Sequence, residues 1–138
     1  MNSHVSAILL GVRDMERSKR FYTDLGWKVK DDWGISVFFV PHGGSIVGFY
    51  GRDGLAANVG TDPEGTGFSG VVFNYVVRSE RRVDEIMAEA ERAGAKILKP
   101  AAAQQWGGYQ GSFADPDGYV WGIGYSAQGE AQPYADDE

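Results

Sequence analysis

Residues 106–125 read WGGYQGSFADPDGYVWGIGY, and this stretch carries the strongest signal for the fold of the chain. Two runs rich in aromatic residues flank the segment Asp115-Pro116-Asp117-Gly118. Proline presets φ, aspartate can hydrogen-bond the backbone that follows it, and glycine accepts positive φ, so the stretch predicts a β-hairpin. It contains no evident nucleophile and no cage of metal ligands.

The residues before this hairpin predict a strand, a helix and a further strand. Ser79 is a suitable N-cap, apolar residues follow at helical spacing, and Gly94 closes the pattern. With the hairpin, the second half therefore reads β-α-β-β-β. The predicted strands are Val71–Val77, Ala95–Leu98, Tyr109–Ala114 and Tyr119–Tyr125.

The first half of the chain predicts the same order of elements. Asp14 is the expected N-cap of a helix that ends at Gly26, a C′ residue. The turn Pro41-His42-Gly43-Gly44 then joins the last two strands. The predicted strands are Val5–Val12, Trp27–Lys30, Ile35–Val40 and Ser45–Tyr50.

The two halves are an internal repeat. Val12-Arg13-Asp14 enters the first helix where Val77-Arg78-Ser79 enters the second, and the turn Pro41-His42-Gly43 corresponds to Pro116-Asp117-Gly118. We therefore predict an α+β fold in one domain, residues 1–138. Its modules span about residues 5–50 and 71–125, joined by a polar linker over 51–70 and followed by an acidic, frayed tail over 126–138.

Composition excludes several classes of function. The formal net charge of −6 argues against binding to nucleic acid, which requires clustered Lys and Arg. The absence of cysteine excludes disulfides, Cys-ligated metals and thiol catalysis. No apolar run has the length of a signal peptide core or a membrane span, so we expect a cytoplasmic protein without a membrane partner.

Three segments carry a resemblance to a known family. Leu10–Tyr22, with Leu25-Gly26-Trp27, and Phe113–Trp121 resemble the vicinal oxygen chelate superfamily, which includes glyoxalase I, bleomycin-resistance proteins and extradiol dioxygenases. The resemblance implies two βαβββ modules whose curled mixed sheets form an open cleft, and paired chains in a homodimer. The stretch from Lys99-Pro100 to Tyr109 is similar to a subgroup whose activity is mostly unassigned.

Metal-dependent members of this superfamily hold one divalent ion with side chains from the first and last strands of each module. The resemblance places these positions at Ala7, Gly48, Tyr75 and Gly122, with Asn74 replacing Tyr75 if the register shifts. None is a histidine or a carboxylate, and His4 and His42 are expected at the surface. We therefore predict a member without metal or other cofactor.

Strand alternation from these positions predicts the residues that line the cleft. On this basis Phe73, Tyr75, Tyr50 and Leu9 share one face, and further aromatic residues are candidates for the rim, although each also suits the core or a dimer interface. The full predicted ligand-binding set is Leu9, Trp33, Phe39, Gly48, Tyr50, Phe73, Tyr75, Trp106, Tyr109, Phe113 and Gly122.

Two functions fit this aromatic cleft. The first is binding, for sequestration or carriage, of a small hydrophobic or aromatic molecule. The alternative is a metal-independent isomerase, cyclase or lyase that acts on a natural-product-like substrate. Tyr50 or Tyr75 would be its acid or hydrogen-bond donor, although an ordinary tyrosine requires tuning for that role.

Overall fold

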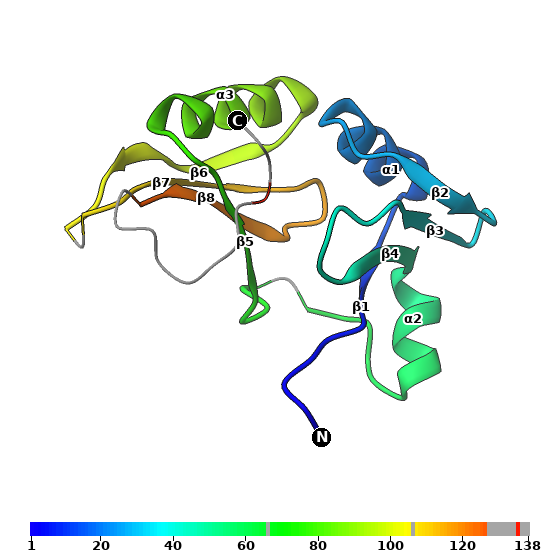
Figure 1. The fold of residues 1–138 in the computed structure, drawn as a ribbon. Helices are drawn as coiled ribbons and strands as arrows, with labels where there is room; N and C mark the ends of the chain where they lie inside the picture. Colours follow the sequence, from blue (N-terminus) through cyan, green and yellow to red (C-terminus); the bar gives the residue numbers. More distant parts are fainter. Residues whose placement is uncertain (66, 106, 127–134, 136–138) are drawn as a thin grey trace. The chain divides into compact units, whose positions relative to one another are not determined.

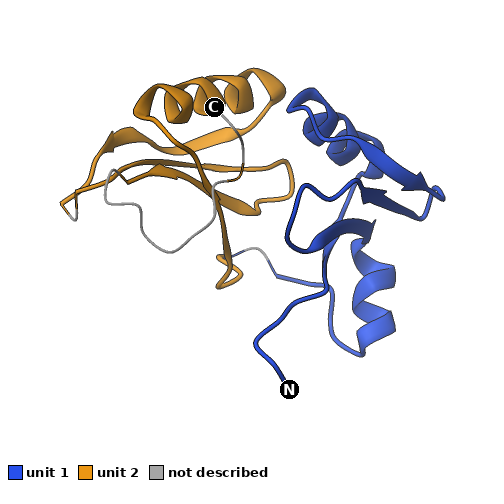
Figure 2. Cartoon of the chain, in the orientation of Figure 1, with its two compact units in different colours: residues 1–67 blue, residues 68–138 orange. Residues whose placement is uncertain are grey.

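The computed structural model describes residues 1–65, 67–105, 107–126 and 135. They form two compact units, unit 1 over residues 1–67 and unit 2 over residues 68–138 (Figure 2). The elements in chain order are β1 (Ala7–Val12), α1 (Met15–Asp24), β2 (Val29–Asp32), β3 (Ser36–Phe39), β4 (Ile46–Gly51), α2 (Arg52–Val59), β5 (Val72–Val76), α3 (Glu80–Ala93), β6 (Lys96–Ala103), β7 (Tyr109–Ala114) and β8 (Val120–Tyr125).

Each unit contains one four-stranded mixed sheet, and the two sheets have the same topology. The strand orders are β1-β4-β3-β2 and β5-β8-β7-β6, with the first strand parallel to the last and the other neighbours antiparallel. The register repeats as well, because Leu9 pairs with Gly48 as Asn74 pairs with Gly122. The predicted α+β fold with two βαβββ modules is confirmed.

The ends of the two main helices follow the sequence signals. The Asp14 carboxylate accepts a hydrogen bond from the Arg17 backbone N–H at 3.1 Å, and the Ser79 hydroxyl accepts one from Arg82 N–H at 3.1 Å. These bonds satisfy backbone donors that have no partner within the helix. Gly94 ends α3 with a φ of 110°, which an L-residue rarely adopts. Both N-caps and the closing glycine are confirmed.

An aromatic core joins α1 to the sheet of unit 1. Tyr22 on α1 is 1% exposed, and its ring centroid lies 5.1 Å from Phe49 on β4 and 4.6 Å from Trp27. Phe39 on β3 completes the cluster at 5.0 Å from Phe49 and 5.2 Å from Trp27. Edge-on and tilted ring pairs of this kind add to the stabilisation from buried area. One face of this sheet is thus covered by α1.

Helix α3 covers one face of the sheet in unit 2 (Figure 1). The backbone of β7 lies close to α3 at Gly111, where an added Cβ would lie 2.9 Å from the terminal methyl carbon of Met87. On the same face Trp121 stacks on Phe113, with ring centroids 6.5 Å apart and planes inclined by 14°. The helix-covered faces of both sheets therefore hold the cores of their units.

The hairpin between β7 and β8 forms as predicted. Asp115 is 6% exposed, and its Oδ1 accepts hydrogen bonds from the backbone N–H groups of Asp117 at 2.9 Å and Tyr119 at 2.8 Å. Gly118 turns the chain with a φ of 88°. A carboxylate that accepts two backbone bonds fixes the turn, and the turn fixes the register of the two strands.

Most predicted boundaries hold to within one or two residues, and the main differences are an additional helix and shifted ends of β2 and β6. The linker contains α2, which the glycines at its start concealed, although Gly60 ends it in the left-handed conformation that a C-cap signal implies. Strand β2 begins at Val29 because Trp27 turns into the aromatic core and donates its N–H to the Tyr22 carbonyl. Strand β6 extends to Ala103, through Pro100, because it lies at the sheet edge.

The predicted tail lies almost wholly outside the described residues. Within the described part of the chain beyond Ser126, the Ala135 N–H donates a hydrogen bond to the Val76 carbonyl, 2.7 Å away, on strand β5. Among the helices that the structure describes, none is long and apolar enough to cross a membrane.

Replacing Asp115 tests how much the hairpin depends on its carboxylate. We expect Asp115→Ala to lower the free energy of unfolding by about 1–3 kcal/mol, because two partly buried backbone donors lose their acceptor. Asp115→Asn keeps one side-chain oxygen acceptor and should lose clearly less. Urea unfolding followed by far-UV circular dichroism measures both, and equal losses in the two variants would contradict the role of the acceptor.

Candidate functional site

Each sheet has a second face, opposite α1 in unit 1 and opposite α3 in unit 2, which we call the far face. In unit 1 the far face follows from the register, since directly paired residues project to the same side of a sheet. Gly48 pairs with Leu9 on one side and with Phe38 on the other, and Tyr50 pairs with Ser36. The far face of unit 1 is formed by Ala7, Leu9, Gly11, Ser36, Phe38, Ile46, Gly48 and Tyr50.

Three aromatic rings form a row on this far face. The Phe38 ring centroid lies 5.9 Å from that of Trp33 and 5.9 Å from that of Tyr50, both with edge-on geometry. Phe38 rests directly on the backbone of Gly48, where an added Cβ would lie 2.5 Å from a ring carbon. Trp33 is 63% exposed and Leu9 is 42% exposed. This row, Trp33, Phe38 and Tyr50, is an accessible aromatic surface that sits on a glycine.

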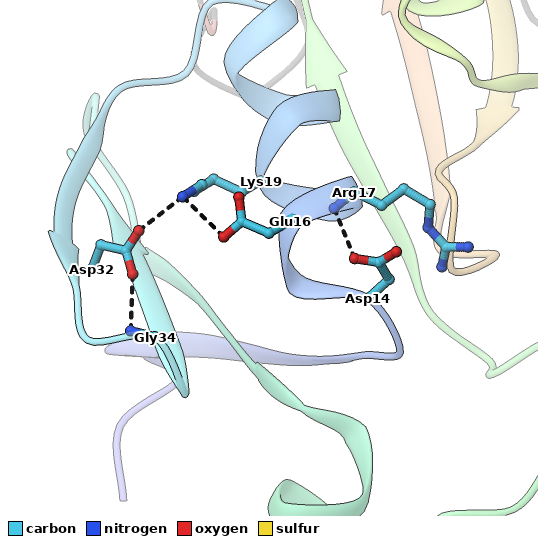
Figure 3. A network of polar contacts seen from close by, with 6 residues as sticks. All are labelled: Asp14, Glu16, Arg17, Lys19, Asp32 and Gly34. Atoms are coloured by element: carbon cyan, nitrogen blue, oxygen red, sulfur yellow. Dashed lines mark hydrogen bonds and ion pairs between the residues drawn. The ribbon is translucent and has the colours of Figure 1, made fainter.

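The turn that carries Trp33 is fixed by the Asp32 carboxylate (Figure 3). One oxygen accepts the Gly34 backbone N–H at 2.9 Å, and the other lies 2.9 Å from the Lys19 ammonium on α1. The Gly34 hydrogen bond, followed by Lys19, lowers the pKa of Asp32. Hydrogen bonds to Asp32 and then to Glu16 raise the pKa of Lys19. Helix α1 therefore holds the Trp33 turn through an ion pair.

Phe39, a predicted rim residue, lies on the other face. It is 2% exposed and packs against Phe49 in the aromatic core under α1. The prediction was wrong by one residue along β3, because successive side chains alternate between faces and Phe38 is the one that pairs with Gly48. Leu9, Trp33, Gly48 and Tyr50, by contrast, are brought together with Phe38 on unit 1.

In unit 2 the sequence predicted that Phe73 and Tyr75 line the cleft face, and this prediction was wrong by one residue along β5, as it was for Phe39 along β3. Asn74, not Tyr75, pairs with Gly122, and the Phe73 ring centroid lies 5.3 Å from Trp121, on the face that α3 covers. Phe113, which is 2% exposed, belongs to that face too. Asn74 therefore lies on the far face, at the position that corresponds to Leu9 in unit 1.

Tyr109 also lies on the side of α3. Its hydroxyl donates a hydrogen bond to Asp84 Oδ1 on the helix at 2.7 Å, and this bond is the main reason that the pKa of Tyr109 is raised. A tyrosine held in its protonated form by a carboxylate joins α3 to the start of β7. Trp106, the remaining predicted ligand-binding residue, lies outside the described residues.

The far face of unit 2 carries polar side chains around Gly122. Asn74 and Gln110 approach Gly122 from the strands on either side of β8, and an added Cβ at Gly122 would lie 2.7 Å from Asn74 Oδ1 and 3.1 Å from Gln110 Nε2. Ser112 pairs directly with Gly122 on this face. Sequence reasoning missed Phe38 and Gln110, and it gave Asn74 only as the alternative to Tyr75. The Ser79 N-cap could have given the correct face for Asn74. Ala7 lies seven residues before the Asp14 N-cap and Val72 lies seven before Ser79, so Val72 aligns with Ala7 and Asn74 aligns with Leu9.

The residues at the positions implied for a metal do not fit a transition-metal ion. Ala7, Gly48 and Gly122 offer no side-chain donor, Tyr75 has only a phenol and Asn74 only a neutral amide, whereas such an ion prefers several imidazole, thiolate or carboxylate ligands. Val72, which lies seven residues before the Ser79 N-cap as Ala7 lies before Asp14, has no donor either. Over the described ranges, no group of three or more His, Asp and Glu side chains is arranged to hold a metal. The donors at these positions are therefore too few and too weak to bind such an ion.

A comparison with protein families identifies the chain. Residues 4–123 match the Glyoxalase/Bleomycin resistance protein/Dioxygenase superfamily, and the protein belongs to this family. No curated protein matches the sequence at a significant level.

Solved structures show the same fold. A glyoxalase-related enzyme from Fulvimarina pelagi has 28% sequence identity and a TM-score of 0.84, over 96% of this chain and 99% of that one. A glyoxalase/bleomycin resistance protein/dioxygenase family enzyme from Burkholderia phytofirmans has 22% identity and a TM-score of 0.76, over 89% and 98%. Lactoylglutathione lyase from Agrobacterium tumefaciens has 20% identity and a TM-score of 0.68, over 94% and 98%.

The adjacent residues Phe38 and Phe39 provide a test of the two faces. We expect Phe39→Ala to lower the free energy of unfolding by about 3–5 kcal/mol, because it opens a cavity in the core. Phe38→Ala should cost clearly less, since that ring is only half-buried on the far face. Urea unfolding measures both, with Phe39→Leu and Phe38→Leu as a milder pair if Phe39→Ala does not fold. A larger loss at position 38 would contradict the assigned faces.

The Asp32 ion pair predicts a pH-dependent stability. Because folding lowers the pKa of Asp32, its ionised form stabilises the protein at neutral pH, and this contribution is lost as pH falls through the folded pKa. We expect Asp32→Asn to lower the melting temperature at pH 7 but not at about pH 2, where the wild-type carboxyl is also neutral. Asp31→Asn, whose carboxylate lies 3.7 Å from Lys30, is the matched control. A pH-independent difference would contradict the ion pair.

Proposed function

We propose that this protein binds a small, planar, hydrophobic molecule and that it does so without a metal ion. The observation that carries the proposal is the aromatic row of Trp33, Phe38 and Tyr50 on the far face of unit 1. Exposed aromatic surface next to an exposed leucine is costly to leave in water, and it offers flat apolar area to a ring-bearing ligand. Sequestration or carriage is the proposed role.

The geometry of the row supports binding by stacking. The Phe38 ring lies against Gly48, so its opposite side is presented outward, and Trp33 extends the surface at the end of the turn that Asp32 fixes. Each aromatic contact contributes about 0.5–1.5 kcal/mol beyond the area that it buries. Two such contacts, held in place by the sheet and by the Asp32 turn, are enough for selective binding of aromatic over aliphatic molecules.

Metal independence is proposed from the chemistry of the donors. Ala7, Gly48 and Gly122 have no side-chain donor at the positions from which a metal-dependent relative would bind its ion. Gly48 also leaves space for the Phe38 ring in unit 1. A homodimer and a cytoplasmic location stay predictions from the sequence.

Catalysis without a metal is the second candidate, and Tyr50 is the residue that favours it. Its ring lies on the far face, 5.9 Å from Phe38, whereas Tyr75 lies toward α3 and no longer suits the role. Tyr50→Phe keeps the ring and removes the hydroxyl. A lyase or isomerase would lose turnover in this variant while it retained substrate affinity, whereas a carrier would be unaffected.

Binding of 2-naphthol, a neutral fused-ring probe, tests the proposal. We expect Phe38→Ala and Trp33→Ala each to weaken binding about 2- to 10-fold, because each removes one ring contact. Titration followed by calorimetry gives the dissociation constants, and addition of EDTA should leave them unchanged.

Two controls make the result specific to the aromatic row. Phe68→Ala removes a phenyl ring that is 71% exposed in unit 2 and should bind 2-naphthol as the wild type does. Cyclohexanol, a ring of similar polarity without π electrons, should bind more weakly than 2-naphthol. Wild-type affinity in both Phe38→Ala and Trp33→Ala would overturn the assignment of the site, and loss of binding in EDTA would overturn metal independence.

A further inference from the structure

The far face of unit 2 holds two side-chain amides that converge on one point. Asn74 projects from β5 and Gln110 from β7, on either side of β8. Asn74 Oδ1 and Gln110 Nε2 lie 2.7 Å and 3.1 Å from the place where a Cβ of Gly122 would be. An acceptor and a donor are therefore close neighbours above a glycine.

The two amides are available to a ligand. Among the described residues, neither side-chain amide has a hydrogen-bond partner, and the bond that reaches Gln110 from Gln104 ends on its backbone carbonyl. The Gln110 side chain lies along β8, since its Oε1 and Cγ are 3.7 Å and 3.8 Å from the Cβ position of Gly124. The glycines at 122 and 124 thus leave the amide groups exposed instead of covering them.

We propose that Asn74 and Gln110 form a recognition site for an amide group, as in a lactam, a cyclic imide or a primary carboxamide. Such a group has an N–H donor beside a carbonyl acceptor, which matches the Asn74 oxygen and the Gln110 nitrogen. A carbonyl without an N–H satisfies only one of the two. The inference goes beyond the proposed function, because it assigns unit 2 a site of its own for a small polar ligand that contains an amide group.

The repeat strengthens the inference. Leu9 and Asn74 occupy the same register position beside the paired glycines, and Phe38 and Ser112 occupy the next. At these two positions unit 1 has apolar residues where unit 2 has polar ones, whereas the counterpart of Gln110 in unit 1 is Ser36. A few polar side chains placed on a sheet face can orient a small molecule within unit 2.

Titration of the full chain with 2-piperidone, a lactam without an aromatic ring, tests the proposal. In ¹⁵N-labelled protein we expect 2-piperidone to shift the side-chain NH₂ resonances of Asn74 and Gln110, but not that of Asn58 on α2. Cyclohexanone, which has the carbonyl but no N–H, should bind with an affinity at least about 5-fold weaker. Equal affinity for the two probes, or no shift at Asn74 and Gln110, would overturn the proposal.

Two glycine variants on one strand provide a matched pair. Gly122→Ala places a methyl group within 2.7 Å of Asn74 Oδ1 and displaces the amides, so it should weaken 2-piperidone binding about 5- to 10-fold. Gly124→Ala meets Gln110 only at ordinary contact distance and should stay within about 2-fold of wild type. Equal effects of the two variants would contradict the site.

The outcomes separate this inference from the proposed function. 2-Piperidone has no aromatic ring to stack on Phe38 or Trp33. If it fails to bind, the amide site is overturned and the proposal for the aromatic row of unit 1 is unaffected. The converse outcome is that 2-naphthol fails to bind, or binds equally in the Phe38→Ala and Trp33→Ala variants, while 2-piperidone still binds selectively and is weakened by Gly122→Ala. That outcome would support the amide site and overturn the aromatic one. Asn74→Leu, which replaces the amide by an isosteric apolar group, should abolish the preference for the lactam over the ketone.

Discussion

The packing of the Tyr22 ring between α1 and the sheet is the contact that organises unit 1. Tyr22 lies against Phe49, Phe39 and Trp27, and together these rings exclude water from one side of the sheet. Because side chains alternate along a strand, the burial of Phe39 forces its neighbour Phe38 onto the far face. The aromatic row is thus a consequence of the core beneath it.

The same constraint acts in unit 2 with a different outcome. Close approach of Met87 to Gly111, and the stack of Phe113 on Trp121, fix the face that α3 covers. Asn74 and Gln110 then lie on the far face, where the equivalent positions in unit 1 are Leu9 and Ser36. The two units therefore share one arrangement of strands but carry different side chains on their far faces.

Glycine has an unusual role at the centre of both far faces. Gly48 and Gly122 occupy equivalent strand positions, and neither adopts the positive φ that would by itself require glycine. Their small size matters instead: a Cβ would collide with Phe38 in one unit and with Asn74 in the other. At these positions glycine leaves space in which neighbouring side chains lie on the backbone.

The amino-acid sequence was sufficient to predict the elements of the two βαβββ modules, their repeat and the family, but not α2. The caps at Asp14 and Ser79 and the turn at Asp115 are local signals set by nearby backbone groups. Leu9, Gly48 and Tyr50 were placed on the correct face by counting from those signals. The folded chain was needed to establish which of Phe38 and Phe39 faces away from the helix, whereas the distance to the Ser79 N-cap could have separated Asn74 from Tyr75. Phe38 and Phe39 are equally compatible with a strand, and the choice between them depends on contacts with α1, which lies far from β3 in the sequence.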